Sequence, residues 1–205
     1  MNEISSRAKK NLGRRKSGTN TRSILLKAAT ELILENGMQP ISVRDISLKA
    51  DVNQAMVHYH FDDKEGLMKA VLNFGFEQLL EQVPADASFE KTIYALISWT
   101  QANAWLLILM MQSVYAGDNL RNHFETEHAP RLAGLYQSAL ENGRKSGLVR
   151  DDLDPKFAMS ALISLVVFPN LAGPSLGRVL GVKRGKNAAK QYTTELLKLF
   201  NPKGE

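Results

Sequence analysis

The chain has 205 residues, 44% of them hydrophobic and 23% charged, with no cysteine and a formal net charge of +5. That length allows one or two domains with a sizeable core, and the lack of cysteine excludes disulfides and thiolate metal sites. The N-terminus is polar, and the longest apolar runs, 104–111 and 161–167, are shorter than the roughly 18 to 20 residues of a membrane span. We therefore expect a soluble, cytoplasmic protein.

The first 22 residues carry most of the positive charge, because they hold seven basic residues and one acidic residue. The remaining chain is nearly neutral. We expect residues 1–20 to form a flexible basic arm. Such an arm can contact the phosphate backbone or the minor groove of DNA, or it can be a solubilising tail without a specific role. The sequence leaves both interpretations open.

Residues 21–37, TRSILLKAATELILENG, have the apolar spacing of an amphipathic helix that ends at Gly37. After it, Ser42 and Asp45 form a capping-box pattern, which predicts a short helix over residues 43–50. The residues that this short helix is expected to bury are Val43, Ile46 and either Leu48 or Ala50.

Residues 51–53 are expected to turn the chain into a second short helix over 54–61, with Asn53 as its N-cap. Helical spacing lets Ala55, Val57 and Phe61 face the core. The side chains left available to a partner are polar or flexible and suit base edges and phosphates: Gln54, Met56, His58, Tyr59 and His60.

A third helix is expected to begin in the segment DDKE at residues 62–65, where aspartate suits the unpaired amides of a helix start. Lys64 is unusual there, since a cation in the first helical turn costs roughly 0.3 to 1 kcal/mol. A phosphate bound by Lys64 and the helix amides offsets that cost, whereas a solvated surface charge needs no partner. Beside the two short helices, the phosphate interpretation is favoured.

This series of signals, a long amphipathic helix, then ISVRDIS, then HYHF followed by KE, resembles the DNA-binding domain of the TetR family of transcriptional regulators over residues 21–67. The chain departs from the usual family pattern in two places. Asp51 replaces the glycine of the turn and is one of the few residue types that tolerate a left-handed backbone. Ala55 and His58 stand where many members have glycine and tyrosine, so the individual DNA contacts differ.

The resemblance implies which side chains contact DNA. Arg44, Gln54 and Met56 match base-contacting positions, and an arginine can donate two hydrogen bonds to guanine O6 and N7. The other residues expected at the DNA, mainly along the phosphate backbone, are Ala55, His58, Tyr59, His60 and Lys64.

The rest of the chain is predicted to be helical, because it shows neither strand-like alternation nor an internal repeat. The helix that starts near Lys64 should run to about Gln82, before Pro84. The further helices are expected from Ser88, over 103–115, from Pro130 to between Gly143 and Gly147, over 155–168 and over 187–200, with a loop over 169–185. The expected fold is all-α, with a helix-turn-helix DNA-binding domain at 21–67 and a helical ligand-binding and dimerisation domain at 68–200.

In TetR-like regulators the last two long helices pair into a dimer interface, and the middle helices surround a small-molecule pocket. The resemblance thus implies a homodimer through residues 155–168 and 187–200, with Leu165 and Leu196 in the interface. Rigid aromatic and adaptable methionine side chains suit an apolar or aromatic ligand, although each is more often an ordinary core residue. The candidate pocket residues are Trp99, Trp105, Met110, Met111, Phe124 and Tyr136.

No motif indicates an enzyme, a cofactor or a metal. The segment GVKRGKN at Gly181 is one residue too short for a phosphate-binding loop and lacks its final Ser or Thr. His123, Glu127 and His128 could share one helical face. A metal site there needs a third convergent ligand, which the sequence does not identify. We therefore expect a solvated helical face there.

Two functions remain. The first is a dimeric regulator that binds a near-palindromic operator in double-stranded DNA and is released from it by a small molecule, most simply as a repressor. The second is a helical small-molecule-binding or interaction protein in which the helix-turn-helix is structural. The basic arm, Lys64 and the HYHF segment favour the first.

Overall fold

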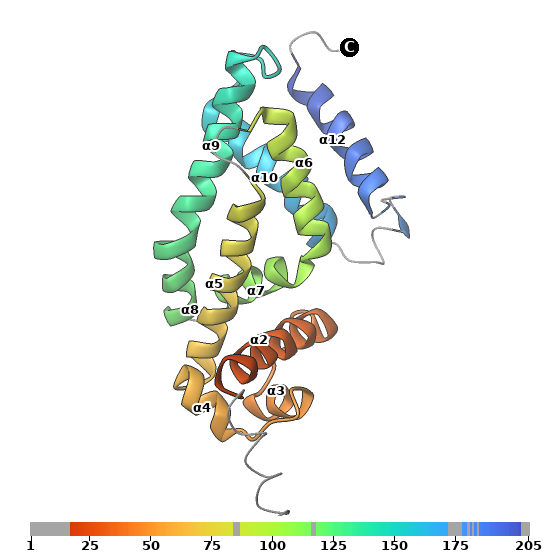
Figure 1. Cartoon of the computed structure of the whole chain (residues 1–205). Coiled ribbons are helices and arrows are strands. Elements are labelled where there is room, and N and C mark those ends of the chain that lie inside the picture. Colours follow the sequence, from red (N-terminus) through yellow and green to blue (C-terminus); the bar gives the residue numbers. More distant parts are fainter. Residues whose placement is uncertain are drawn as a thin grey trace, which may run out of the picture. The chain divides into compact units, whose positions relative to one another are not determined.

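The computed structural model describes residues 17–83, 87–115, 118–171, 178–179, 181, 183 and 185–201. Within these ranges the regular structure is helical and contains no strand, so the all-α prediction is confirmed (Figure 1). The elements in chain order are α2 (Ser17–Asn36), α3 (Val43–Lys49), α4 (Ala55–Phe61), α5 (Lys64–Gln82), α6 (Phe89–Ala102), α7 (Ala104–Tyr115), α8 (Asp118–His123), the π-helix η1 (Phe124–His128), α9 (Ala129–Lys145), α10 (Pro155–Leu171) and α12 (Lys186–Phe200).

Backbone contacts divide the chain into two compact units, residues 1–71 and 72–205. In the first unit α2 packs against α3 and α4. Its core follows the spacing of the sequence, since Leu25, Ala29 and Ile33 lie four residues apart on α2 and are fully buried. They are joined in this core by Ile46 of α3 and Val57 of α4, which are also fully buried.

Polar contacts hold α3 in place at both ends. The predicted capping box is present, because the Asp45 amide donates to the Ser42 hydroxyl and the Ser42 amide donates to the Asp45 carboxylate, each at 3.1 Å. The Ser42 hydroxyl also donates to the Asp45 carboxylate, and this bond, together with the one from the Ser42 amide, lowers the pKa of Asp45 below its usual value. At the other end, the Lys49 ammonium lies 2.6 Å from Glu35 and 3.6 Å from Glu31 of α2. Lys49 is thus committed to an ion pair within this unit.

The turn between α3 and α4 depends on a left-handed residue. Asp51 has φ +52°, as its place in the glycine position of the turn predicts. A second such residue, Asp62 with φ +68°, ends α4 and was not expected. Both are aspartates, and aspartate tolerates this backbone region better than most residues.

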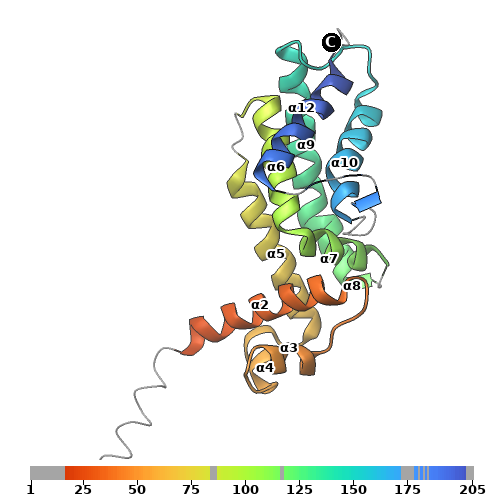
Figure 2. The same ribbon diagram turned by 90° about the vertical axis from the view of Figure 1, so that its right-hand side faces the viewer.

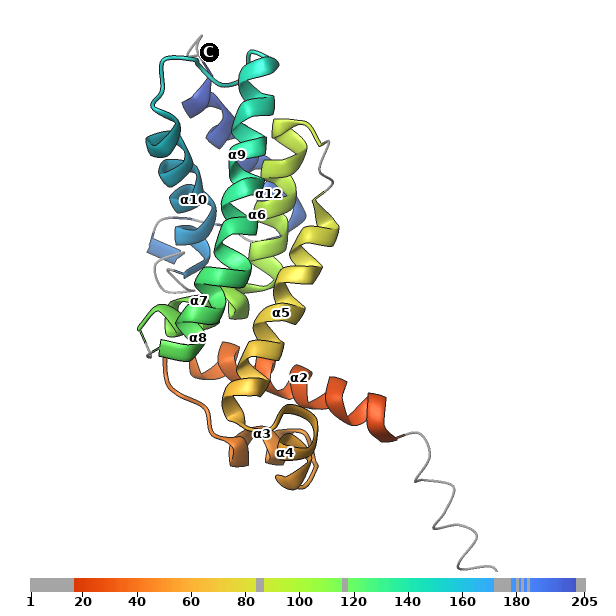
Figure 3. The ribbon, with the colours of Figure 1, turned by 90° about the vertical axis from the view of Figure 1, so that its left-hand side faces the viewer.

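In the second unit α6 packs against α7, α9, α10 and α12. Figures 2 and 3 show the axes of α6, α9, α10 and α12 roughly aligned, with α6 and α10 running opposite to α9 and α12. The chain bends by 83° between α6 and α7, and together these two helices have the length and apolar character of a membrane span. Among the described residues, no single helix does.

Gly75 allows α5 to approach α7 closely. A Cβ atom at this position would lie 2.7 Å from Cη2 of Trp105 and 2.8 Å from Cδ1 of Leu106. Any side chain there would displace α7, because both neighbours are well buried.

The C-terminal helices differ from the sequence-based expectations in two respects. The loop expected from Pro169 is wrong at its start, because α10 continues through Pro169 to Leu171. A proline inside a helix leaves the carbonyl four residues earlier without its amide partner. That carbonyl, of Leu165, instead accepts a hydrogen bond from the Tyr192 hydroxyl of α12 at 2.9 Å.

The second difference concerns the positions expected in a dimer interface. Leu196 is buried inside its own chain and Leu165 is half-buried, so neither gives an outward-facing probe of assembly. The start of α2 also precedes the expected position, at Ser17 instead of Thr21. Most of the predicted basic arm, and residues 172–177, 180, 182 and 184 of the predicted loop, lie outside the described residues.

The left-handed turn gives a direct stability test. Asp51→Val should lower the free energy of unfolding by about 1 to 2 kcal/mol, because a β-branched residue is strained at positive φ. Asp51→Gly is the matched control and should be neutral or stabilising by up to about 1 kcal/mol. Urea titration of both variants measures the difference, and equal stabilities would contradict the assigned turn.

Candidate nucleic-acid interface

A surface depression of about 320 Å³ lies between α3 and α4. Its lining combines charged, amide and aliphatic side chains, namely Arg44, Ser47, Leu48, Val52, Asn53 and Gln54. Two of the three residues expected to reach base edges, Arg44 and Gln54, therefore line one depression. Arg44 is exposed and makes no ion pair with any described residue.

The start of α4 is fixed by the residue expected to cap it. The Asn53 side-chain oxygen accepts from the amide of Ala55 at 2.9 Å, and α4 begins at Ala55, one residue later than predicted. Gln54 stays exposed at this end. Because the cap uses the Asn53 side chain, the neighbouring Gln54 amide remains available to a partner.

The two faces of α4 differ in burial. Val57 and Phe61 are buried as predicted, and Phe61 also lies beneath the Arg22 guanidinium of α2, 5.2 Å from its ring centre. The prediction that Ala55 faces the core is wrong, because Ala55 is exposed. It precedes Val57 by two positions, about 200° around the helix, so it points away from the buried stripe.

The other α4 side chains vary in their exposure. Tyr59 is 77% exposed and His58 is exposed, whereas Met56 and His60 are half-buried. His58 donates from Nδ1 to the carbonyl of Asp62 at 2.7 Å, which fixes its ring against the end of α4. The Nε2 atom of His60 is buried without a partner, and this ring packs edge-on against Tyr59. The outward surface of α4 is thus formed mainly by Ala55, His58 and Tyr59.

Lys64 begins α5 as an exposed residue with no ion-pair partner among the described residues. The next cation, Lys69, pairs with Glu65 at 2.6 Å. The Asp63 side chain accepts from the amide of Gly66 at 2.7 Å, so one amide of this helix start already has a partner. The geometry leaves the Lys64 ammonium free for an external anion.

The sequence is compatible with either orientation of Leu48, and the structure decides between them. Leu48 is 69% exposed and lines the α3–α4 depression, while Ala50 takes the buried position. Beside Leu48, Ser47 is buried with its hydroxyl lacking a partner. A large apolar side chain on an otherwise polar surface suits the methyl group of thymine.

The match to known proteins is clearest over this unit. A model of the family described as "Bacterial regulatory proteins, tetR family" matches residues 25–71. The chain is 26% identical over 180 residues to the HTH-type transcriptional repressor NicS of Pseudomonas putida, covering 83% of this chain and 85% of NicS. Residues 25–71 of this chain are thus a DNA-binding domain of the TetR type, and the chain as a whole is similar to HTH-type transcriptional regulators.

Two further similarities extend along most of the chain. It is 27% identical over 156 residues to the repressor KstR2 of Rhodococcus jostii, covering 72% of this chain and 76% of KstR2. The crystal structure of AibR in complex with isovaleryl coenzyme A and operator DNA superposes with a TM-score of 0.71 at 17% identity, covering 89% of this chain and 98% of AibR. The AibR likeness shows a shared fold across both units.

The second unit does not gather the six candidate pocket residues around either of its two described cavities. Trp99, Trp105 and Tyr136 are buried, and burial raises the pKa of Tyr136. The residues that are half-buried are Met110, Met111 and Phe124. The described cavities lie elsewhere, one between α6, α10 and α12 and the other between α9 and α10.

Two histidines of the second unit converge on one amide. The Nε2 atoms of His123 and His128 each lie 2.8 Å from the side-chain oxygen of Asn73 on α5. His128 is 2% exposed and stacks on Phe76 with ring centres 4.3 Å apart, so a solvated face is wrong for this residue. The cause is η1, because a π-helix brings residues five apart onto the same side.

This cluster favours neutral histidine over metal binding. An amide oxygen only accepts, so both Nε2 atoms carry the proton, and the buried Nδ1 of His128 is left without a partner. Metal binding at Nε2 would require a proton at that Nδ1, where no acceptor lies. Among the described residues, no group of three or more His, Asp or Glu side chains could hold a metal ion.

Burial lowers the pKa of His128 from 6.5 to about 4, and the nearby charges of His123 and Arg131 lower it further. Glu127 and Glu77 act in the opposite direction. Below pH 6.5 the unfolded chain therefore binds a proton that the folded chain does not. The resulting loss of stability is complete near pH 4 and reaches at most about 3 kcal/mol.

His128→Gln should consequently flatten the decline of unfolding free energy between pH 6.5 and pH 4, whatever its effect at pH 7.5. Urea titrations at four pH values across this window measure the slope. The unchanged chain, titrated at the same pH values, is the reference. An unaltered slope in His128→Gln would assign the acid sensitivity to other groups.

Proposed function

We propose that this TetR-family regulator is a cytoplasmic, dimeric repressor that binds a near-palindromic DNA operator and is released from it by a small-molecule effector. The observation that carries the proposal is the outward surface of α3 and α4, where Gln54 lines one depression together with Arg44, which has no ion-pair partner among the described residues. NicS and KstR2 are both named as repressors, which supports the same direction of regulation. The role is regulatory, not catalytic.

The proposed contacts fall into two groups. Arg44, Gln54 and Met56 read base edges, and Arg44 suits guanine because its guanidinium donates two hydrogen bonds. Backbone phosphates are bound along the end of α4 and the start of α5, with Tyr59 and Lys64 the most accessible anchors. His58 and Ala55 add exposed surface, and His60 contributes mainly by packing against Tyr59.

The proposed dimer uses the outward faces of α10 and α12. Phe157 and Phe168 are 68% and 57% exposed, and they lie on one face of α10 because eleven residues make slightly more than three helical turns. On α12, Leu199 is 66% exposed. Large apolar side chains exposed together on neighbouring helices are expected to be covered by a partner, and a second copy of the chain provides the same surface in a two-fold arrangement.

The proposed effector acts through α5, which is one continuous helix from Lys64 to Gln82. Its C-terminal half is held in the second unit by Asn73 and by an ion pair of 2.8 Å between Glu77 and Arg131. A small apolar or aromatic ligand bound within residues 88–168, near the six candidate residues, would shift α5. Nearly complete release needs about 10⁴-fold tighter binding to the released form, or about 5.5 kcal/mol.

AibR is described as a complex with isovaleryl coenzyme A and operator DNA, so an acyl thioester is a reasonable first effector to test. A helical ligand-binding or interaction protein with a structural helix-turn-helix is the alternative. That alternative predicts DNA binding without sequence preference.

Selection of tight binders from random duplex DNA tests the proposed function. The purified chain should enrich a near-palindrome with half-sites about 34 to 36 Å apart, or a multiple of that. Arg44→Ala should cost about 1 to 3 kcal/mol and relax the preference at one base pair in each half-site. Lys64→Ala should weaken all sequences similarly and reduce the salt slope by about 1.

The two variants serve as controls for each other. If Lys64→Ala changed the selected sequence and Arg44→Ala did not, the assignment of reading and anchoring residues would be reversed. If no sequence were enriched, the alternative function would be favoured.

The dimer proposal predicts that Phe168→Glu gives a folded monomer that no longer binds the operator tightly, because it places a charge in the apolar surface. Tyr115→Glu is the matched control, since Tyr115 is 74% exposed but lies on α7. Sedimentation equilibrium measures the mass and circular dichroism the helix content. A Phe168→Glu protein that remained dimeric would locate the interface elsewhere.

A further inference from the structure

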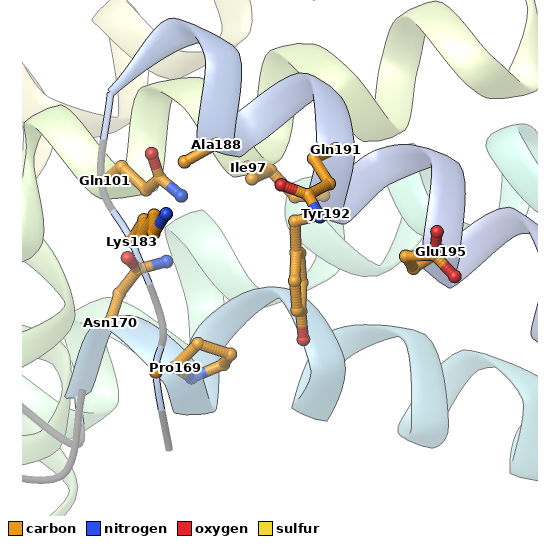
Figure 4. Close-up of a pocket in the computed structure, with 10 residues that line it drawn as sticks. Ile97, Gln101, Pro169, Asn170, Lys183, Ala188, Gln191, Tyr192 and Glu195 are labelled. Atoms are coloured by element: carbon orange, nitrogen blue, oxygen red, sulfur yellow. The ribbon is translucent and has the colours of Figure 1, made fainter. Parts of the chain in front are cut away.

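One polar cavity of the second unit has no role in the function proposed above. It has a volume of about 350 Å³, in the range of small-molecule sites, and lies between α6, α10 and α12. None of the six candidate pocket residues lines it. Figure 4 shows Gln101, Lys183 and Asn170 towards one end of this cavity and Glu195 towards the other, with Tyr192 between them.

Asn170 provides a fixed hydrogen-bond acceptor. It is only 7% exposed, and its amide nitrogen donates to Thr100 Oγ1 at 3.1 Å and to the Val166 carbonyl at 3.0 Å. The Thr100 hydroxyl gives its own proton to the Leu96 carbonyl at 2.7 Å, so it must accept from Asn170. Both amide hydrogens of Asn170 are thereby used, and its Oδ1 has no partner among the described residues.

Gln101 and Lys183 provide donors at the same end. The Gln101 side-chain oxygen accepts from the Gly185 amide at 3.3 Å, which leaves the Gln101 amide hydrogens without a described partner. Lys183 is exposed and forms no ion pair with a described residue. This end therefore combines one positive charge, amide donors and one buried acceptor.

The middle and the far end of the cavity lack the free donors and the free acceptor found at the end formed by Lys183, Gln101 and Asn170. Ile97, Pro169, Ala188 and the Tyr192 ring provide mostly apolar walls. Tyr192 has already donated its hydroxyl hydrogen to Leu165. At the far end, Glu195 is paired with Lys198 at 3.0 Å, so its charge is largely compensated. The uncompensated charge in the cavity is that of Lys183.

We propose that this cavity binds a small carboxylate that carries a hydroxyl or amino group on the adjacent carbon and an apolar body. The carboxylate lies against Lys183 and the Gln101 amide, the hydroxyl or amino group donates to Asn170 Oδ1, and the apolar body packs against Tyr192 and Pro169. This site is distinct from the proposed effector pocket, and its existence does not depend on DNA binding.

The probes are phenyllactate, 2-hydroxyisocaproate and phenylalanine, titrated calorimetrically into the full chain. At least one should bind saturably at one site per chain. For phenyllactate, removing the hydroxyl (3-phenylpropanoate) should weaken binding about threefold to tenfold, the range for a neutral hydrogen bond. Removing the charge (the methyl ester) should weaken it about tenfold to hundredfold, the range for a hydrogen bond that involves a charged group.

Lys183→Met should weaken phenyllactate binding by a similar factor and leave the methyl ester unaffected. Lys190→Met is the matched control, because Lys190 is an exposed lysine of α12 that does not line the cavity. The proposal is overturned if none of the three probes binds saturably, if the analogues bind as tightly as phenyllactate, or if both lysine variants lose affinity equally.

Discussion

Burial of α6 is the constraint on which the second unit depends. This helix contacts α7, α9, α10 and α12, so its side chains form the centre of the unit. Its buried polar residue Thr100 needs partners inside the core. The Thr100 hydroxyl donates to its own helix and accepts from Asn170, and this chain of bonds fixes both the packing of α10 on α6 and the direction of the Asn170 oxygen. One core requirement thus shapes the polar end of a cavity.

The first unit is small, and a small domain buries a smaller fraction of its surface, so its apolar core contributes less stability. Caps and one ion pair hold α3 against α2, and the short α4 rests on Val57 and Phe61. Lys49 forms an ion pair inside the unit. Arg44 and Lys64 are exposed and have no ion-pair partner among the described residues. Because the partners inside the unit are used by other polar groups, Arg44 and Lys64 remain available to bind DNA.

Backbone geometry connects the two C-terminal helices. Pro169 within α10 frees the Leu165 carbonyl, and Tyr192 of α12 supplies the missing hydrogen bond. The same tyrosine ring forms a wall of the cavity between these helices. Because α10 and α12 also carry Phe157, Phe168 and Leu199 outward, this helix pair presents two different surfaces, a cavity lining and a set of exposed apolar side chains.

The sequence by itself determined the local features of this protein. The caps at Ser42 and Ser88, the left-handed Asp51 and the helical class each depend on residues within about four positions, and such short-range patterns are visible along the chain. The three-helix pattern was also sufficient to identify a TetR-type DNA-binding domain. Tertiary structure alone decided that Leu48 turns outward and Leu196 inward, since both fit an apolar stripe and only the packing of neighbouring helices distinguishes them. It also brought His123 and His128 to Asn73, which is 50 and 55 residues away, because contacts between distant segments leave no period in a single sequence.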